Sequence, residues 1–212
     1  PEGTLTILDD VSFMINAGES VAVTGPSGAG KSTLLALLAG LDLPTSGHVE
    51  LNGTNLSDLD EDGRALLRAD NVGFVFQSFH LVPSLKALEN VMLPLELAGH
   101  DDPRKAAREL VDKVGLTDRW SHYPAQLSGG EKQRVAIARA FATEPAVLFA
   151  DEPTGNLDSR TGETIMALMF ELNRSSSTTL VLVTHDNALA DRCDRVLALE
   201  TGRLVRDGEA AA

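Results

Sequence analysis

Short apolar runs alternate with segments of helical periodicity along most of the chain. Apolar, β-branched runs bounded by turn residues predict strands, and the segment 195–205 predicts a hairpin that turns at Thr201–Gly202. A helix is expected over 31–41, directly after the first of these strands. Strands alternating with helices are typical of an α/β domain with a parallel sheet. The expected strands are 20–25, 48–53, 71–77, 146–153 and 178–186.

The pattern becomes helical in the middle of the chain. The segment 102–116 has an acidic cap, a first-turn proline and apolar residues at helical spacing, and 128–142 also has a helical pattern. No strand is expected between about 78 and 145. The chain is therefore predicted to be one domain, 1–212. Residues 1–85 and 143–212 form its core, and a helical subdomain of about 86–142 interrupts that core.

Composition is that of an ordinary globular protein, with 43% hydrophobic and 23% charged residues. The formal net charge of −13 argues against non-specific nucleic-acid binding and against direct docking on an anionic membrane. The single cysteine, Cys193, excludes an internal disulfide and is read as a packed residue. The longest aliphatic stretch, 34–41, is too short to span a bilayer.

A phosphate-binding loop is predicted where the first strand meets the first helix. The sequence from Gly25 to Ser32 matches G-x-x-x-x-G-K-[ST] in the strand–helix context that this motif requires. Lys31 is expected to reach the β- and γ-phosphates, Ser32 to hold Mg²⁺, and Thr33 to reach the α-phosphate. The alternative is an ordinary glycine-rich turn. The backbone expected to wrap the phosphates is that of Gly25, Pro26, Ser27, Gly28, Ala29 and Gly30.

Polar residues follow three other predicted strands. Asp151 and Glu152 follow four apolar residues, and we expect Asp151 on the Mg²⁺ side and Glu152 to orient or deprotonate an attacking water. His185 ends another strand, at the sheet edge where ligands bind, and is expected to contact the γ-phosphate. Gln77 ends the strand 71–77 and is a candidate ligand for Mg²⁺ or water. For each, a purely structural role is the alternative.

A second anion cradle is predicted at Ser128, Gly129 and Gly130, which open a helix. One triphosphate already fills the first cradle. If both cradles face the same γ-phosphate, the second most simply comes from another copy of the chain. The pattern therefore suggests a head-to-tail dimer with two ATP molecules at its interface.

Together these motifs resemble ABC-type ATPase domains over nearly the whole chain. The resemblance maps 25–33 to Walker A, Gln77 to the Q-loop, 127–131 to the signature, 147–152 to Walker B, 156–158 to the D-loop and His185 to the switch histidine. It implies an α/β fold: a P-loop (RecA-like) core with an inserted helical subdomain and an N-terminal β subdomain. It further implies ATP and Mg²⁺ as cofactors, Glu152 as the catalytic carboxylate, and Asp158 reaching across a dimer of ATP sandwiches.

A narrower resemblance concerns the lipoprotein-release and macrolide-export group. The stretches 74–95, 123–141 and 148–162 look like that group, in which Gly155–Asn156 is characteristic where many importers carry Ser-Ala, and the chain looks closest to the YbbA-type ATPases. The resemblance implies a separate membrane permease with a large periplasmic part as partner. It places the chain at the cytoplasmic face of the inner membrane, attached through that permease.

Part of an apolar patch is expected to receive a permease helix, and internal packing of each residue is the alternative. The patch consists of Phe79, Leu81, Val82 and Leu85. Two other functions remain open: a soluble ABC ATPase of DNA repair or translation, and a regulatory module that binds nucleotide without turnover. The complete set of Lys31, Asp151, Glu152 and His185 argues against the second.

Two departures from the family pattern stand out. No aromatic residue precedes Phe13, which itself is expected in a strand over 8–13, so the residue that stacks on adenine is expected upstream of Pro1. Glu131 stands where the family more often has Gln, a variant that this group tolerates.

Overall fold

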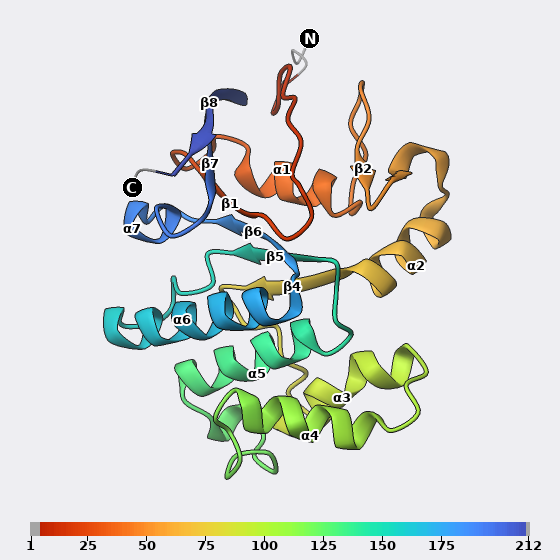
Figure 1. Ribbon diagram of the computed structural model, residues 1–212, viewed down its shortest axis with the longest axis vertical. Coiled ribbons are helices and arrows are strands. Elements are labelled where there is room, and N and C mark those ends of the chain that lie inside the picture. Colours follow the sequence, from red (N-terminus) through yellow and green to blue (C-terminus); the bar gives the residue numbers. More distant parts are fainter. Residues whose placement is uncertain (1–4, 211–212) are drawn as a thin grey trace.

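A parallel sheet forms the centre of the molecule (Figure 1). The computed structural model describes residues 5–210. The strand order is β4-β5-β6-β1-β7-β8, and only β8 runs antiparallel to its neighbour. The α/β fold class is therefore confirmed, as is the hairpin at Thr201–Gly202. The strands are β1 (Ser20–Thr24), β4 (Val72–Phe76), β5 (Val147–Asp151), β6 (Thr179–Val183), β7 (Arg195–Glu200) and β8 (Arg203–Glu209).

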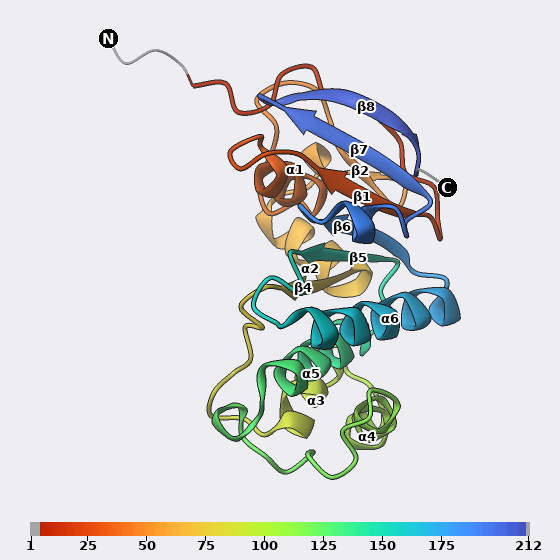
Figure 2. The same cartoon turned by 90° about the vertical axis from the view of Figure 1, so that its left-hand side faces the viewer.

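Both faces of the sheet are buried, because successive side chains of each strand enter different cores. In β1, Val21 and Val23 join the core beneath α1, whereas Ala22 joins the core beneath α5 and α6. Figure 2 shows α1 and α5 on opposite sides of the sheet. The helices are α1 (Lys31–Leu38), α2 (Glu61–Asn71), α3 (Ala87–Leu97), α4 (Pro103–Lys113), α5 (Gly129–Phe141), α6 (Ser159–Ser176) and α7 (Asn187–Ala190).

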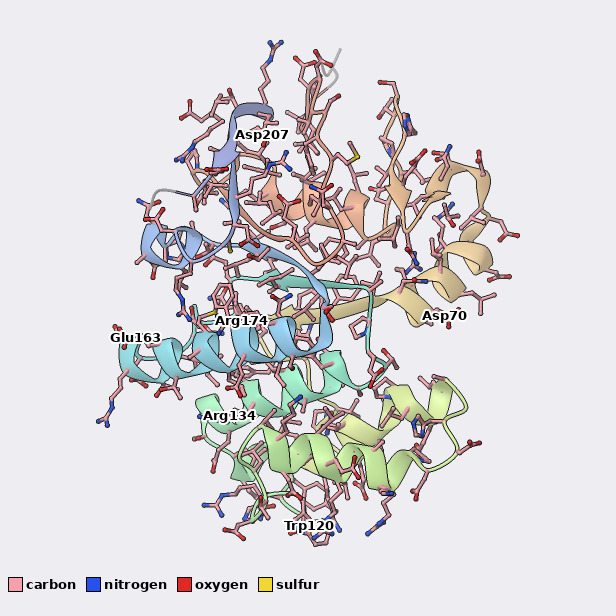
Figure 3. All side chains as sticks on the ribbon, in the orientation of Figure 1. Asp70, Trp120, Arg134, Glu163, Arg174 and Asp207 are labelled. Atoms are coloured by element: carbon pink, nitrogen blue, oxygen red, sulfur yellow. The ribbon has the colours of Figure 1, made fainter. Side chains whose placement is uncertain are left out.

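Helices occupy the interrupting segment, as predicted, and within the described chain no strand lies between 78 and 145. The α3 and α4 helices lie together at the end of the molecule away from β7 and β8 (Figure 2). Trp120 lies at this end and Asp207 at the opposite one (Figure 3). The Arg108 guanidinium lies 4.7 Å from the centre of the Trp120 ring, a cation–π contact between α4 and the loop that follows it. No helix in the described part is both long and apolar enough to cross a bilayer.

The N-terminal region differs from the prediction. Residues 8–13 do not form a strand. A hydrogen bond from Asp9 N–H to the Gly202 oxygen (2.8 Å) joins the segment to the β7–β8 turn, but Asp10 has a φ of 50°, so no ladder continues from it. A left-handed residue breaks the pleat that a ladder needs. The segment is instead held by Val11 and Phe13, which pack against the core beneath α1.

The strand expected over 48–53 is also shorter than predicted. The structure places there a small hairpin of β2 (Glu50–Leu51) and β3 (Thr54–Asn55). Within the described residues, the strands that precede β4 are β1 and the two strands of this hairpin.

Gly73 lets α5 approach β4 closely. A methyl group at this position would overlap the carbonyl oxygen of Ala140 in α5 and would crowd Leu148 and Pro145. Because the Ala140 oxygen is part of the helix backbone, it cannot turn aside as a side chain could. The distance between α5 and the sheet therefore depends on the absence of a side chain at Gly73.

We expect Gly73→Ala to lower the free energy of unfolding by about 2 kcal/mol, because overpacking a rigid site typically has an effect of this size. The matched control is Gly208→Ala in β8, where a methyl group meets no atom within 4 Å, so its effect should stay within about 0.5 kcal/mol. Urea unfolding followed by circular dichroism measures both variants. Equal midpoints would show that α5 does not pack this closely on β4.

Candidate functional site

The predicted phosphate loop joins β1 to α1. Its glycines adopt backbone angles that other residues rarely take, with φ of 81° at Gly28 and 98° at Gly30. Gly30 is the N-cap of α1 and supplies no side-chain cap, which leaves the first N–H groups of the helix available to an anion. The Lys31 ammonium donates to the carbonyl oxygens of Gly25 (2.7 Å) and Pro26 (3.0 Å).

Strand register brings the other predicted residues to the same edge of the sheet. Phe76, Asp151 and Val183 are direct neighbours across β4, β5 and β6. Val23 of β1 continues the row. The residues that follow each strand therefore emerge together: Gln77, Glu152, His185 and the phosphate loop.

Asp151 is a half-buried carboxylate at this edge. Burial raises its pKa above the usual range, the Glu152 carboxylate raises it further, and the Lys31 ammonium acts in the opposite direction. A cation close to Asp151 would favour its ionised form in the same way as Lys31 does. The environment of Asp151 thus suits a side chain that meets positive charge when the site is filled.

Glu152 and His185 form a direct pair. Glu152 Oε1 lies 2.8 Å from His185 Nδ1. Glu152 has a φ of 47°, and its N–H donates to the Val183 oxygen (2.9 Å), which holds the turn after β5. A left-handed conformation at a glutamate is uncommon and is found preferentially at functional sites.

The loop after β5 contacts the loop after β4. Gln77 and Asn156 exchange two hydrogen bonds, one from Gln77 Nε2 to Asn156 Oδ1 (3.2 Å) and one from Asn156 Nδ2 to the Gln77 main-chain oxygen (2.9 Å). Asp158, two residues further on, caps α6 by accepting from Thr161 N–H (3.0 Å). Hydrogen bonding with the Thr161 side chain, and then with its N–H, lowers the pKa of Asp158.

The LSGG segment, residues 127–130, opens α5. Ser128 is the N-cap, and it forms a capping box in which Ser128 N–H donates to Glu131 Oε2 (2.8 Å) and Glu131 N–H donates to Ser128 Oγ (3.3 Å). The hydrogen bond from the Ser128 backbone is the main cause that lowers the pKa of Glu131. A glutamate therefore performs the capping role at the position where the family more often has Gln.

The LSGG segment does not meet the phosphate loop of its own chain. A side-chain carbon at Gly129 would lie within 4 Å of Leu157 and Phe79, and one at Gly130 within 4 Å of Thr161; no atom of residues 25–33 is that close to either position. Helices α1 and α5 lie on opposite sides of the sheet (Figures 1 and 2). The two anion cradles are therefore separate within one copy.

Two residues of α5 escaped the sequence analysis. Gln133 is fully buried and donates to the Pro153 oxygen (2.6 Å), next to Glu152. Arg139 donates to the main-chain oxygens of Phe79 (3.1 Å) and His80 (2.6 Å), the two left-handed residues of the loop after β4. Burial lowers the pKa of the Arg139 guanidinium. For Arg139 the available signal was a charged residue within the otherwise apolar stretch 135–141.

The apolar patch is partly internal. Leu81 packs against the core beneath α5, and Val82 is held by the buried Asn90, whose amide pairs with both the N–H (2.8 Å) and the oxygen (3.2 Å) of Val82. Phe79 and Leu85 are half-buried. Internal packing, the alternative reading, therefore accounts for Leu81, whereas the contacts of Val82 involve only its main chain.

A metal at this edge would be held by mixed oxygen donors. Within the described residues no group of three or more His, Cys, Asp or Glu side chains could hold a metal ion. The Ser32 hydroxyl, the Asp151 carboxylate and the Gln77 amide oxygen are hard donors, and a site with one carboxylate suits Mg²⁺, which keeps water and substrate phosphates as its other ligands. The donor set fits this cation.

The adenine-stacking residue expected upstream of Pro1 lies outside the described residues. The second predicted departure, Glu131, is the capping-box partner of the N-cap Ser128.

Comparisons with known proteins agree with the motifs. A family model described as "ABC transporter" matches residues 8–155. The ABC transporter ATP-binding protein YbbA of Escherichia coli (strain K12), itself uncharacterized, is 57% identical over 205 residues, which cover 96% of this chain and 90% of that protein. The lipoprotein-releasing system ATP-binding protein LolD of Xanthomonas campestris pv. campestris (strain 8004) is 52% identical, covering 93% of this chain and 84% of LolD.

Solved structures show the same fold. The dimeric ATP-binding cassette MJ0796, in a post-hydrolysis state bound to ADP and Pi, matches with a TM-score of 0.90 and 43% identity, covering all of this chain and 94% of that one. A second dimeric structure of MJ0796 matches with a TM-score of 0.89 and 44% identity.

Proposed function

The chain belongs to the ABC transporter family as an ATP-binding subunit, and we propose that Lys31, Glu152 and His185 carry out its ATP hydrolysis in a site shared by two copies. The observation that carries this assignment is the convergence of the phosphate loop, the Asp151–Glu152 pair and His185 at one sheet edge. The transport role is that of the family, and the comparisons give no support to a soluble ATPase of DNA repair or translation.

The roles of the residues follow from their positions. The N–H groups of Gly28, Gly30 and the first turn of α1 bind the phosphates, and Lys31 exchanges its two carbonyl acceptors for β- and γ-phosphate oxygens. Ser32 and Thr33 continue this contact along the helix.

Glu152 acts as the base. It accepts the proton of a water whose oxygen forms a bond to the γ-phosphorus, while the bond from that phosphorus to the bridging oxygen breaks and ADP leaves. His185, paired with Glu152 at 2.8 Å, orients the carboxylate and contacts the γ-phosphate.

Ser32, Asp151 and Gln77 are proposed to hold Mg²⁺. When bound, this ion would offset the negative charge of the phosphates. Asp151 then meets a second positive charge in addition to Lys31, which favours its ionised form against the raised pKa that burial imposes.

The second copy completes the site. Ser128, Gly129 and Gly130 open α5 away from their own phosphate loop, and we propose that they bind the γ-phosphate held by the partner copy. Asp158, two residues after Asn156, is proposed to approach the partner's phosphate loop. The dimeric form of MJ0796 supports this arrangement.

A membrane permease is the proposed second partner. The similarity to LolD, a component of a lipoprotein-releasing system, supports a permease of the exporter or lipoprotein-release type. The chain would then work at the cytoplasmic face of the inner membrane, attached through that permease. Within the patch, Phe79, Val82 and Leu85 are the candidates for contact, because the side chain of Leu81 packs against the core.

We expect Glu152→Gln to reduce the turnover of ATP by about 100-fold or more, the range that a general base supplies, with ATP affinity retained. Phosphate release and ATP titration measure the two quantities. The matched control is Glu163→Gln on the exposed side of α6, which should hydrolyse ATP as the unchanged chain does. Unreduced turnover in Glu152→Gln would mean that Glu152 is not the base.

The partner is tested by affinity purification from native membranes. Tagged Glu152→Gln protein with MgATP should be held in its ATP-bound form, and mass spectrometry should then recover a permease with a large periplasmic domain. Recovery of ribosomal or DNA-associated proteins without any membrane protein would contradict the proposed permease partner.

A further inference from the structure

We propose that Gly155 and Asn156 are positioning residues for Gln77: they orient its side-chain amide so that Oε1 is presented as a metal ligand. This inference rests on the proposed role of Gln77 toward Mg²⁺.

The hydrogen bonds fix both amide groups. A main-chain carbonyl can only accept, so the NH₂ group of Asn156 must face the Gln77 oxygen, to which it lies at 2.9 Å. Asn156 Oδ1 is then the atom that faces the Gln77 side chain, at 3.2 Å, and it can only accept. The Gln77 NH₂ group must therefore point toward Asn156.

The remaining atom of the Gln77 amide is Oε1. No residue in the described part of the chain donates a hydrogen bond to it. An amide oxygen is a suitable ligand for Mg²⁺, whereas an NH₂ group is not. A Gln77 amide free to rotate would present the wrong group part of the time, and Asn156 removes that orientation.

Gly155 provides the space for this contact. A methyl group built on Gly155 would lie 2.6 Å from Gln77 Nε2 and 2.9 Å from Gln77 Cδ. Gly155 has no positive φ, so alanine fits the backbone there, and only the Gln77 side chain would have to move. Substitution at this position should thus displace Gln77 with little effect on the fold.

A purely stabilising role fits the contacts poorly. Gln77, Gly155 and Asn156 are all exposed, and hydrogen bonds between exposed amides compete with water and add little to stability. What the contact does restrict is the direction of one amide. Groups that orient a metal ligand typically change metal affinity when they are removed.

The experiment measures how strongly Mg²⁺ and ATP binding are coupled. In the Glu152→Gln background, which prevents turnover, calorimetry gives the Kd of ATP without Mg²⁺ and with saturating Mg²⁺. Asn156→Ala and Gly155→Ala should each reduce the ratio of these constants by about 10-fold, while the Kd without Mg²⁺ stays unchanged. A general disturbance of the site would change both constants.

The matched control is Asn52→Gly, since Asn52 has a φ of 49° that glycine adopts without strain. It removes a comparable exposed amide hydrogen bond, from Asn52 Nδ2 to Asn71 Oδ1 (2.9 Å), at a place remote from the sheet edge. The ratio of ATP constants should be the same in this variant as in the background protein.

Combination with Gln77→Ala separates the proposed metal role of Gln77 from the proposed positioning role of Gly155 and Asn156. Gln77→Ala alone should reduce the ratio, and adding Asn156→Ala or Gly155→Ala should then reduce it no further. If Gln77→Ala leaves the ratio unchanged, the proposed metal role of Gln77 is wrong. If Gln77→Ala reduces the ratio but the loop variants do not, or if their effect persists without Gln77, the positioning role is overturned.

Discussion

The parallel register of β1, β4, β5 and β6 is the constraint on which the site depends. It places Val23, Phe76, Asp151 and Val183 in one row, so that four connections leave the sheet at a common edge. Parallel strands must be joined by long crossovers, and the chemistry is carried by residues that begin these crossovers. A shift of one strand by a single residue would turn its following side chain to the other face of the sheet.

Helix α5 is the second element on which the site depends, because it contacts two of the loops at the sheet edge. It begins with the LSGG segment, donates from Gln133 to Pro153 beside Glu152, and donates from Arg139 to the loop that contains Phe79 and His80. One rigid element thus holds the loop after β4 and the loop after β5, and its own N-terminus is the surface proposed to meet the second copy. The close approach at Gly73 fixes this helix against the sheet. We expect α5 to transmit a displacement at the LSGG segment, on contact with nucleotide, to both loops.

Much of this arrangement could be predicted from the sequence, and the reasons are local. Buried parallel strands consist of apolar runs, so β1, β4, β5 and β6 were identified, and the phosphate loop has a fixed spacing. The strand over 8–13 was wrong, because alternating apolar residues pack on the core there without a partner strand. The contacts of Gln133, Arg139 and Asn156 link residues far apart in sequence. No local sequence pattern predicts which carbonyl oxygen such an amide or guanidinium will bind. The residue roles themselves, and the division into core and helical subdomain, stay predictions.

The central claim is that each ATP site uses the phosphate loop of one copy and the LSGG segment of the other. The most direct test mixes two variants, Lys31→Ala and Ser128→Arg, after confirming that the Ser128→Arg chain still binds ATP. Each variant alone should be nearly inactive. Their mixture contains dimers with one site that combines an unchanged Lys31 and an unchanged Ser128 from different chains, so ATP hydrolysis should rise well above the sum of the separate activities. A mixture no more active than that sum would contradict the shared site.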